Sequence, residues 1–312
     1  MKKYIYIASR KKDGGLYKFS NLYDEKYEFI DFTPVDSPMY MKIVDEKMYV
    51  ILRSPFANGH SGVCHFEISD QGKLINQTEI ISTEGKVACH LEICDDAVYC
   101  VNYSSGNFKK VPGPLIVYAE EGKTSHPHYV GKTPDGLYLC VTDLGLDKIY
   151  IYDMQMGLKN VIPMPHGCGV RHIAFSECGK YAFTSNELDS TVSVLRYRDG
   201  NMDLIDTIRC LPPDFDGDSA AAAIRVYDNK IYVSNRGHDS ISELSFDGKQ
   251  LKLTDNFKCL GNGPRDFIFH ENQIVCANQN SNNVTVFEKD ENKSFVLIQE
   301  IQIEEPICVV CK

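Results

Sequence analysis

Arginine, histidine and glutamate residues recur between positions 90 and 266, each beside a short apolar run. A guanidinium group can hold a carboxylate or a phosphate through two parallel hydrogen bonds. A histidine or a glutamate can move a proton, so a set gathered in one place could bind an anion and direct water onto a carbonyl. The residues of interest are His90, His126, His128, Arg171, His172, Glu187, Arg236, His238, Arg265 and Asp266.

The elements that must position these residues repeat along the chain. A short run of strand type ends in a polar residue, usually Asn or Asp, as in residues 181–186 (YAFTSN) and 231–235 (IYVSN). Five such runs end at positions 102, 143, 186, 235 and 278, and two weaker copies end at positions 9 and 52, so that successive ends are 41 to 50 residues apart. This period is typical of a propeller blade of about four short strands. The sequence therefore predicts an all-β, seven-bladed β-propeller in which residues 1–312 form a single domain.

The two ends of the chain are predicted to complete one blade together. Residues 305–311 have the pattern of a blade's first strand, and no second strand follows them. The chain begins at residues 4–8 with what would be a second strand. Pairing of these two segments would close the ring and leave no unpaired edge.

The repeat also predicts that the polar residues share one mouth of the central channel. In each blade the first strand runs to a hairpin turn and the second strand returns, so the start of one lies beside the end of the other. Arg171 and His172 begin a first strand, and Glu187 follows the second strand of the same blade. The same rule places the following residues at that mouth: His90, Tyr103, His126, His128, Arg236, His238, Arg265 and Asp266.

Charge narrows the class of ligand. The chain has 33 basic and 43 acidic residues and a net charge of −10, which excludes the electrostatic footprint of a nucleic-acid or anionic-membrane binder. Three of its nine arginines and five of its nine histidines are nevertheless placed at the mouth. A cationic pocket in an acidic protein predicts a small anionic ligand. The alternative is that these residues tie neighbouring blades together through buried salt bridges.

We expect a cytoplasmic protein. The N-terminal apolar run meets the polar residues 9–13 before a signal-peptide core develops, and no stretch approaches the about 18 consecutive apolar residues of a membrane span. The 12 cysteines are then expected to be buried, reduced thiols. The sequence does not fix the oligomeric state.

Six motifs stand in order and in register with the repeat. They are residues 126–128 (HPH), 169–172 (GVRH), 185–188 (SNEL), 235–240 (NRGHDS), 263–267 (GPRDF) and 277–281 (ANQNS). Together they resemble the lactonase family of seven-bladed propellers, which contains the propeller-type bacterial 6-phosphogluconolactonases and the fungal carboxymuconate lactonizing enzyme. The resemblance covers nearly the whole chain and is weakest over the first 85 residues.

The resemblance implies a metal-independent lactonase without a cofactor, which opens 6-phospho-D-glucono-1,5-lactone in the pentose phosphate pathway. The catalytic set proposed for the family falls on His128, Arg171, Glu187 and Arg236, with His128 or Glu187 moving protons and the arginines orienting the anion. Two alternatives stay open, an enzyme that cyclises a carboxymuconate and a non-catalytic propeller that binds a sugar acid or a protein. The residues that would bind substrate are His90, His126, His172, His238, Arg265 and Asp266.

Some patterns depart from the family or suggest other chemistry. Where some members carry an acid near the start of the sixth blade, this chain reads AAAIR at residues 221–225, which shifts weight to Glu187 and Asp266. His126 and His128 could ligate a metal, but spacing supplies no third ligand. Cys168 is interpreted as a buried thiol rather than a nucleophile. Residues three apart on a strand face opposite sides, so residues 308–311 (CVVC) are not predicted to form a zinc site. Residues 238–240 (HDS) are of the types found in a catalytic triad, but contiguous side chains cannot adopt a triad's geometry.

Overall fold

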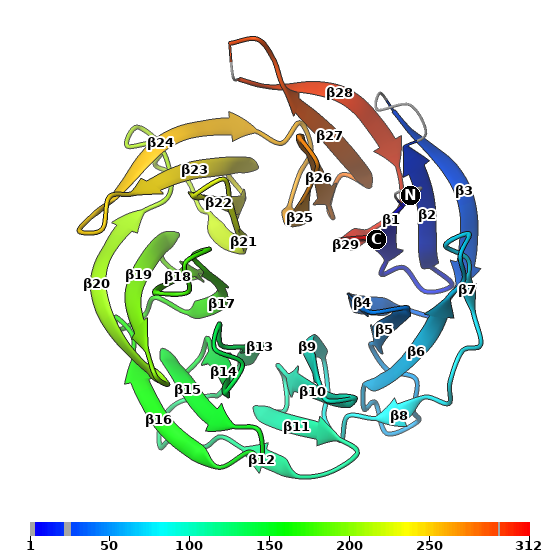
Figure 1. Cartoon of the computed structure of the whole chain (residues 1–312), viewed down its shortest axis with the longest axis horizontal. Coiled ribbons are helices and arrows are strands. Elements are labelled where there is room, and N and C mark those ends of the chain that lie inside the picture. The colour runs from blue at the N-terminus through cyan, green and yellow to red at the C-terminus, as the bar shows by residue number, and fades with distance from the viewer. Residues whose placement is uncertain (1–3, 22–25, 293) are drawn as a thin grey trace. The chain divides into compact units, whose positions relative to one another are not determined.

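The computed structural model describes residues 4–21, 26–292 and 294–312, and within them every regular element is a β-strand. These strands form seven antiparallel sheets, six of four strands and one of five (Figure 1). Each sheet is one blade, so the fold is the all-β, seven-bladed propeller that the repeat predicts. In the described part of the chain no helix is long and apolar enough to cross a membrane.

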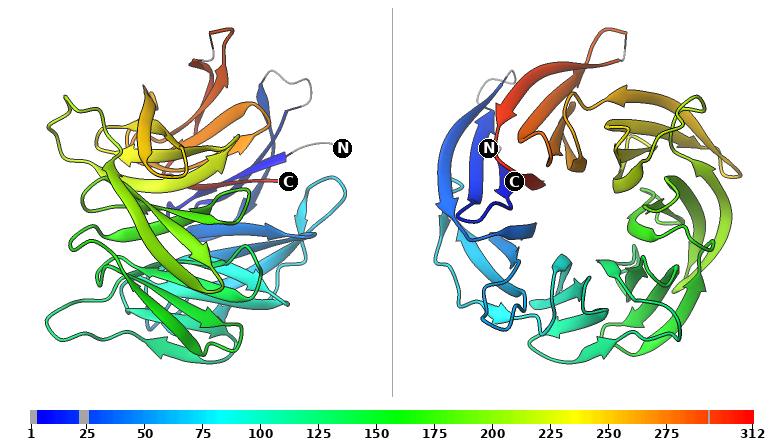
Figure 2. Two further views of the ribbon diagram at one scale, coloured as in Figure 1. Left: turned by 60° about the vertical axis from the view of Figure 1, so that its left-hand side comes forward. Right: turned by 180° about the vertical axis from the view of Figure 1, so that it is seen from behind.

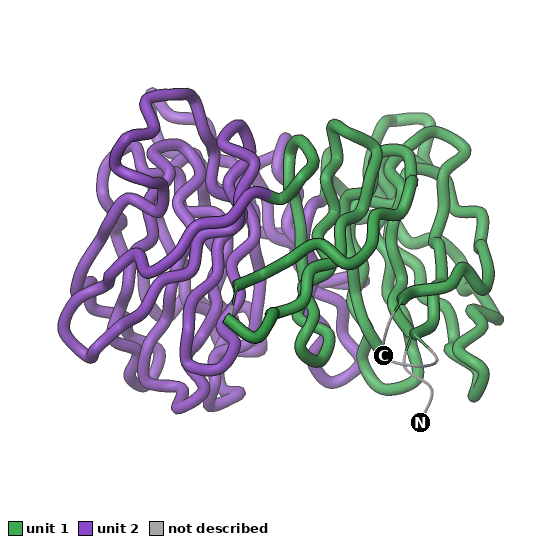
Figure 3. Tube along the Cα trace, turned by 90° about the horizontal axis from the view of Figure 1, so that it is seen from above, with its two compact units in different colours: residues 1–88, 259–312 green, residues 89–258 purple. Residues whose placement is uncertain are grey.

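The chain divides into two compact units, which Figure 3 colours separately. Residues 89–258 form the unit that contains most of the predicted site residues. Whether the two units behave as one domain stays a prediction. The sheets of residues 89–258 are β9 (Ala88–Cys94), β10 (Ala97–Asn102), β11 (Asn107–Val111) and β12 (Leu115–Val117); β13 (Pro127–Lys132), β14 (Tyr138–Asp143), β15 (Lys148–Asp153) and β16 (Leu158–Pro163); β17 (Val170–Phe175), β18 (Tyr181–Asn186), β19 (Thr191–Arg198) and β20 (Asn201–Arg209); and β21 (Ala220–Tyr227), β22 (Lys230–Arg236), β23 (Ser240–Phe246) and β24 (Leu251–Lys258).

The other unit consists of residues 1–88 and 259–312. One of its sheets replaces the single outer strand with two short ones, because both β7 and β8 pair with β6. Its sheets are β29 (Pro306–Cys311), β1 (Tyr4–Ser9), β2 (Gly15–Asn21) and β3 (Tyr27–Pro34); β4 (Pro38–Val44), β5 (Lys47–Leu52), β6 (Gly62–Ile68), β7 (Leu74–Ile75) and β8 (Ile81–Ser82); and β25 (Pro264–His270), β26 (Gln273–Asn278), β27 (Asn283–Lys289) and β28 (Phe295–Gln302).

The two ends of the chain pair as the sequence predicts. Strand β29 lies antiparallel beside β1, with Ile5 opposite Cys311 and Ala8 opposite Cys308 (Figure 2). The Tyr4 amide donates to the Lys312 carbonyl at 3.1 Å, and the Lys312 amide donates to the Tyr4 carbonyl at 2.9 Å. The first and last strands therefore complete one blade.

The asparagines at the ends of two of these runs, Asn186 and Asn235, have a structural role. Asn186 is fully buried, and its Nδ2 donates to Thr191 Oγ1 at 2.8 Å and to Ser193 Oγ at 2.9 Å. Asn235 does the same in the next blade, with Nδ2 at 2.9 Å from Ser242 Oγ. A satisfied buried network of this kind fixes the turn into the third strand. It therefore fixes the backbone immediately before residues 187 and 236.

The cysteines largely follow the expectation from composition. Ten of the 12 are buried and all are free thiols, whereas Cys178 and Cys311 are exposed. Residues 308 and 311 of the CVVC segment differ in this way because they lie on one strand with opposite orientations.

Candidate functional site

Strand register brings the start of each first strand to the end of the second, as the topology predicts. Val170 pairs with Asn186 across β17 and β18, and the Glu187 amide donates to the Gly169 carbonyl at 2.8 Å. In the following blade Ala220 pairs with Arg236. Arg171, Glu187 and Arg236 therefore lie at the same ends of neighbouring blades.

A β-bulge recurs at the start of the first strands. The register shifts between Pro127 and Tyr129 in β13 and between Val170 and His172 in β17. His128 and Arg171 are the extra residues at these two shifts. A bulge re-aims a side chain that regular alternation would direct elsewhere. This explains how consecutive residues such as Arg171 and His172 can both contribute to one cluster.

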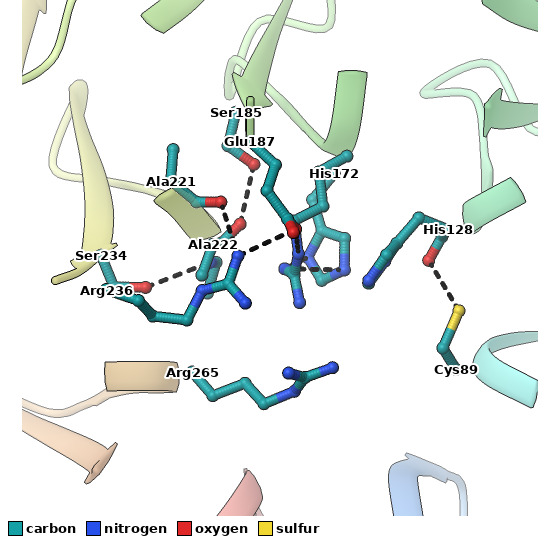
Figure 4. Close-up of polar contacts among 12 residues, drawn as sticks. Cys89, His128, His172, Ser185, Glu187, Ala221, Ala222, Ser234, Arg236 and Arg265 are labelled. Atoms are coloured by element: carbon teal, nitrogen blue, oxygen red, sulfur yellow. Dashed lines mark hydrogen bonds and ion pairs between the residues drawn. The ribbon is translucent and has the colours of Figure 1, made fainter. Parts of the chain in front are cut away.

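Glu187 is shared by two arginines. Its Oε2 lies 2.8 Å from Arg171 Nε. The same oxygen lies 2.9 Å from Arg236 Nη2 (Figure 4). The Arg236 Nη2 also donates to the Ala221 carbonyl at 3.4 Å. One carboxylate between two guanidinium groups leaves a net charge of about +1, as guanidinium stays protonated.

The two arginines differ in their exposure. Only 3% of the Arg171 side chain is accessible, against 21% for Arg236 and 19% for Glu187. Solvent, and therefore a ligand, can reach Arg236 and Glu187, whereas Arg171 is almost wholly buried.

His172 lies beside the buried Arg171, and two more histidines pack on the His172 ring. Arg171 Nη1 lies 3.2 Å from Nε2 of His172, whose ring centre is 5.1 Å from that of His128 and 5.3 Å from that of His90. Burial lowers the pKa of His172 well below its ordinary value, and the nearby charge of Arg171 lowers it further. The His172 ring is therefore neutral at physiological pH, and it is a weak base.

Tyr103 contacts both His126 and His128 through its ring. Their rings stack at 4.3 Å with an interplanar angle of 11°, and His126 Nδ1 lies 3.0 Å from the Tyr103 carbonyl. The Tyr103 ring meets His128 edge-on at 5.8 Å. Burial raises the pKa of Tyr103, as does the nearby charge of Glu187. The phenol therefore stays protonated at neutral pH and can donate a hydrogen bond.

Residues 4–311 match the family model described as "Lactonase, 7-bladed beta-propeller". The chain belongs to this lactonase family. Membership confirms the resemblance carried by the six motifs, and it agrees with the sheet order described above.

The chain is also similar to other proteins along its whole length. This chain is 30% identical to an uncharacterized protein of Staphylococcus aureus over an alignment 342 positions long, gaps included, which covers 98% of each chain. A protein of Lactobacillus plantarum shares 25% identity at a TM-score of 0.87, with both chains fully covered. A periplasmic gluconolactonase of Pseudomonas aeruginosa has the same fold at 21% identity and a TM-score of 0.87, covering 100% of this chain and 99% of its own.

Sequence reasoning missed Tyr129 as a member of the histidine cluster. Its ring lies 4.4 Å from that of His90 and 5.7 Å from that of His172. A Cβ added to Gly131 would come within 2.1 Å of the Tyr129 hydroxyl, so the glycine leaves room for the phenol. A glycine inside a strand, two residues after an aromatic and on the same face, is the sequence signal that could have found it.

His238 is held by other residues of its own unit. Its Nδ1 lies 2.7 Å from Ser240 Oγ, and Phe215 packs on its ring at 4.5 Å. The sequence predicts no triad geometry for residues 238–240, yet His238 and Ser240 are within hydrogen-bond distance of each other. Ser240 is fully buried, and Asp239 Oδ1 accepts a hydrogen bond from the Gly237 amide, so these contacts support a structural role.

Arg265 and Asp266 belong to the unit of residues 1–88 and 259–312. Arg265 Nη1 donates to Gln279 Oε1 at 3.5 Å, and Asp266 Oδ2 accepts from the Val309 amide at 3.1 Å. Within this unit Asp266 therefore holds strand β29 in place.

The other features that the sequence singled out, Cys168, residues 221–223 and a metal site, show no reactive or ligating group in the described residues. Cys168 is fully buried, and burial together with Asp147 raises the pKa of its thiol, which stays protonated. The alanines 221–223 are fully buried; the Ser185 hydroxyl donates to the Ala222 carbonyl at 2.8 Å. Among the described residues, no three His, Cys, Asp or Glu side chains are arranged to hold a metal ion.

Proposed function

We propose that this chain is a hydrolase that opens 6-phospho-D-glucono-1,5-lactone by attack of water at the Arg171–Glu187–Arg236 cluster and the adjoining histidines. The observation that carries the proposal is the carboxylate of Glu187 between two guanidinium groups, 2.8 and 2.9 Å away, in a chain of net charge −10. A local positive charge in an acidic protein favours an anionic substrate. Membership of the lactonase family supports ring opening as the reaction.

The proposed reaction adds water to the lactone carbonyl. His128 accepts a proton from the attacking water, and the carbonyl oxygen becomes an oxyanion that the net positive charge of the Arg171–Glu187–Arg236 cluster stabilises. The bond from the carbonyl carbon to the ring oxygen then breaks, and His128 returns the proton to that oxygen. The products are an alcohol and a carboxylic acid on one open chain, and the acid then releases its proton to solvent and becomes a carboxylate. No oxidant or reductant is needed.

Two observations favour His128 over the other proton carriers. The Oε2 atom of Glu187 is already shared by Arg171 and Arg236. His172 has a pKa well below its ordinary value, so it is a poor base. His128 adjoins Tyr103 and lies at a bulge of β13.

The proposal places this chemistry in the cytoplasm, within the pentose phosphate pathway, and without a metal. Turnover should then be unchanged after treatment with EDTA, and zinc or magnesium should not increase it. Loss of activity on chelation would overturn the metal-independent part of the proposal.

The deciding experiment is a lactonase assay that is coupled to detection of the acid and corrected for spontaneous opening. We expect the phosphorylated lactone to be turned over far faster than plain gluconolactone. Equal turnover of the two would contradict a phosphate-specific site. Turnover of a carboxymuconate would instead identify the cyclising enzyme, and tight binding of the sugar acid without turnover would identify a binding propeller.

A further inference from the structure

We infer that Glu187 is an internal anion that occupies the ligand's place on Arg236, and that an anionic ligand binds by displacing it. The inference rests on the proposed function only in placing the ligand's anionic group at this cluster. It concerns binding, so it can be tested without any lactone. The ligand group is an anion with oxygen acceptors, either a phosphate or a carboxylate.

The exposure of the three side chains supports displacement at Arg236. Arg171 is 3% exposed, and its Nε lies 2.8 Å from Glu187 Oε2, so this ion pair is closed to solvent on the arginine side. Arg236 and Glu187 are 21% and 19% exposed, so their contact at 2.9 Å is the part that a ligand can reach. An arriving anion therefore competes with Glu187 for Arg236 and leaves the Arg171–Glu187 pair in place.

The chemistry of the contacts points the same way. Arg236 Nη2 is shared between Glu187 Oε2 at 2.9 Å and the Ala221 carbonyl at 3.4 Å. A carboxylate on a guanidinium is the same pairing that a carboxylate or phosphate ligand would make. The ligand thus exchanges one anion for another, and the free energy of the internal pair is subtracted from its affinity.

The difference in exposure between Arg171 and Arg236 gives the two arginines different roles. Arg236 contacts the ligand, while Arg171 is a positioning residue that holds Glu187 and the His172 ring, which lies 3.2 Å from its Nη1. A symmetric pair that grips the ligand equally would need comparable exposure at both arginines.

The test measures binding of inorganic phosphate and of sodium gluconate by calorimetry at low ionic strength. Glu187→Gln removes the competing charge, so we expect both anions to bind at least about tenfold more tightly than to the wild type. The order of the two affinities in the wild type identifies which anionic group the site prefers. The gain should shrink as salt is added, because Arg236 is partly exposed.

The chain offers a matched control. Glu120 is also a carboxylate between two cations, Lys123 at 2.7 Å and Lys148, and it lies in the same unit outside the cluster. Glu120→Gln changes the net charge by the same amount, and we expect its phosphate affinity to stay within about twofold of the wild type. Unchanged or weaker binding in folded Glu187→Gln, or an equal gain in Glu120→Gln, would overturn the inference.

A second measurement does not depend on the variant's folding. In a crystal structure of the wild type soaked with phosphate, we expect the anion on Arg236 and the Arg236 Nη2–Glu187 Oε2 distance lengthened from 2.9 Å. Phosphate bound at Arg236 with that contact intact would overturn displacement.

Discussion

Arg171 Nε lies 2.8 Å from Glu187 Oε2 in a pair whose arginine side chain is 3% exposed. Arg171 is the second residue of β17 and Glu187 follows β18, so the hairpin brings their backbones together and the bulge at Arg171 directs its side chain. The burial of Arg171 makes the pair an element of stability as well as of the site.

Replacing Arg171 should therefore destabilise the fold. Arg171→Met leaves Glu187 without its buried partner, and we expect the free energy of unfolding to fall by about 3 kcal/mol. Urea unfolding followed by far-ultraviolet circular dichroism measures it. Arg198, whose side chain is 87% exposed beside Asp199, is the control, and Arg198→Met should change stability by less than about 0.5 kcal/mol. Equal effects of the two changes would contradict the structural role of Arg171.

Buried His172 should make stability dependent on pH. Its folded pKa lies well below the ordinary value of 6.5, so below pH 6.5 the unfolded chain binds a proton that the folded chain refuses. Stability is therefore full above that pH and falls as pH drops, by at most about 1.4 kcal/mol per pH unit for this group. His172→Gln should reduce this slope. His166→Gln, which removes a histidine side chain that is 95% exposed, is the matched control.

Gly131 should be intolerant of a side chain. In Gly131→Ala the new methyl group would press on the Tyr129 phenol, and we expect a loss of about 1–3 kcal/mol in stability. Because Tyr129 packs on the rings of His90 and His172, turnover should fall as well. Adding Tyr129→Ala removes the obstacle, so the double variant should be no less stable than Tyr129→Ala alone. An additive loss would show that the methyl group meets something other than Tyr129.

The cysteines should react in a defined order with iodoacetamide. Cys178 is exposed, and a hydrogen bond with Ser176 lowers the pKa of its thiol, so it should be modified first. Cys311 is exposed, but burial of its thiol raises its pKa and should slow it. Cys168 should remain unmodified in the folded protein, and Cys168→Ala should retain turnover. Mass spectrometry of the native protein reads the order, and early modification of Cys168 would contradict its burial.

The repeat predicts the fold because it reports backbone features. In five of the seven blades the run ends in a buried Asn or Asp, and at Asn186 and Asn235 this residue fixes a turn, so its spacing measures the blade length. The pairing of β1 with β29 also follows from the pattern, since one segment lacks a second strand and the other lacks a first.

The side-chain arrangement is less accessible to sequence reasoning. The bulges at His128 and Arg171 break the two-residue alternation from which facing is predicted, so the sequence cannot say which of two neighbours turns inward. The contact of Phe215 with His238 depends on the path of a loop. The unequal exposure of Arg171 and Arg236 follows from how neighbouring blades pack, which no local pattern records.

The most direct test of the central claim is steady-state turnover of 6-phospho-D-glucono-1,5-lactone by the wild type, His128→Gln and Arg236→Met. Spontaneous opening is subtracted, and circular dichroism confirms folding of each variant. We expect kcat/KM to fall at least about 100-fold in His128→Gln, because a general base typically contributes that much. Arg236→Met should raise KM as well as lower kcat. Turnover equal to the wild type in both folded variants would contradict the account.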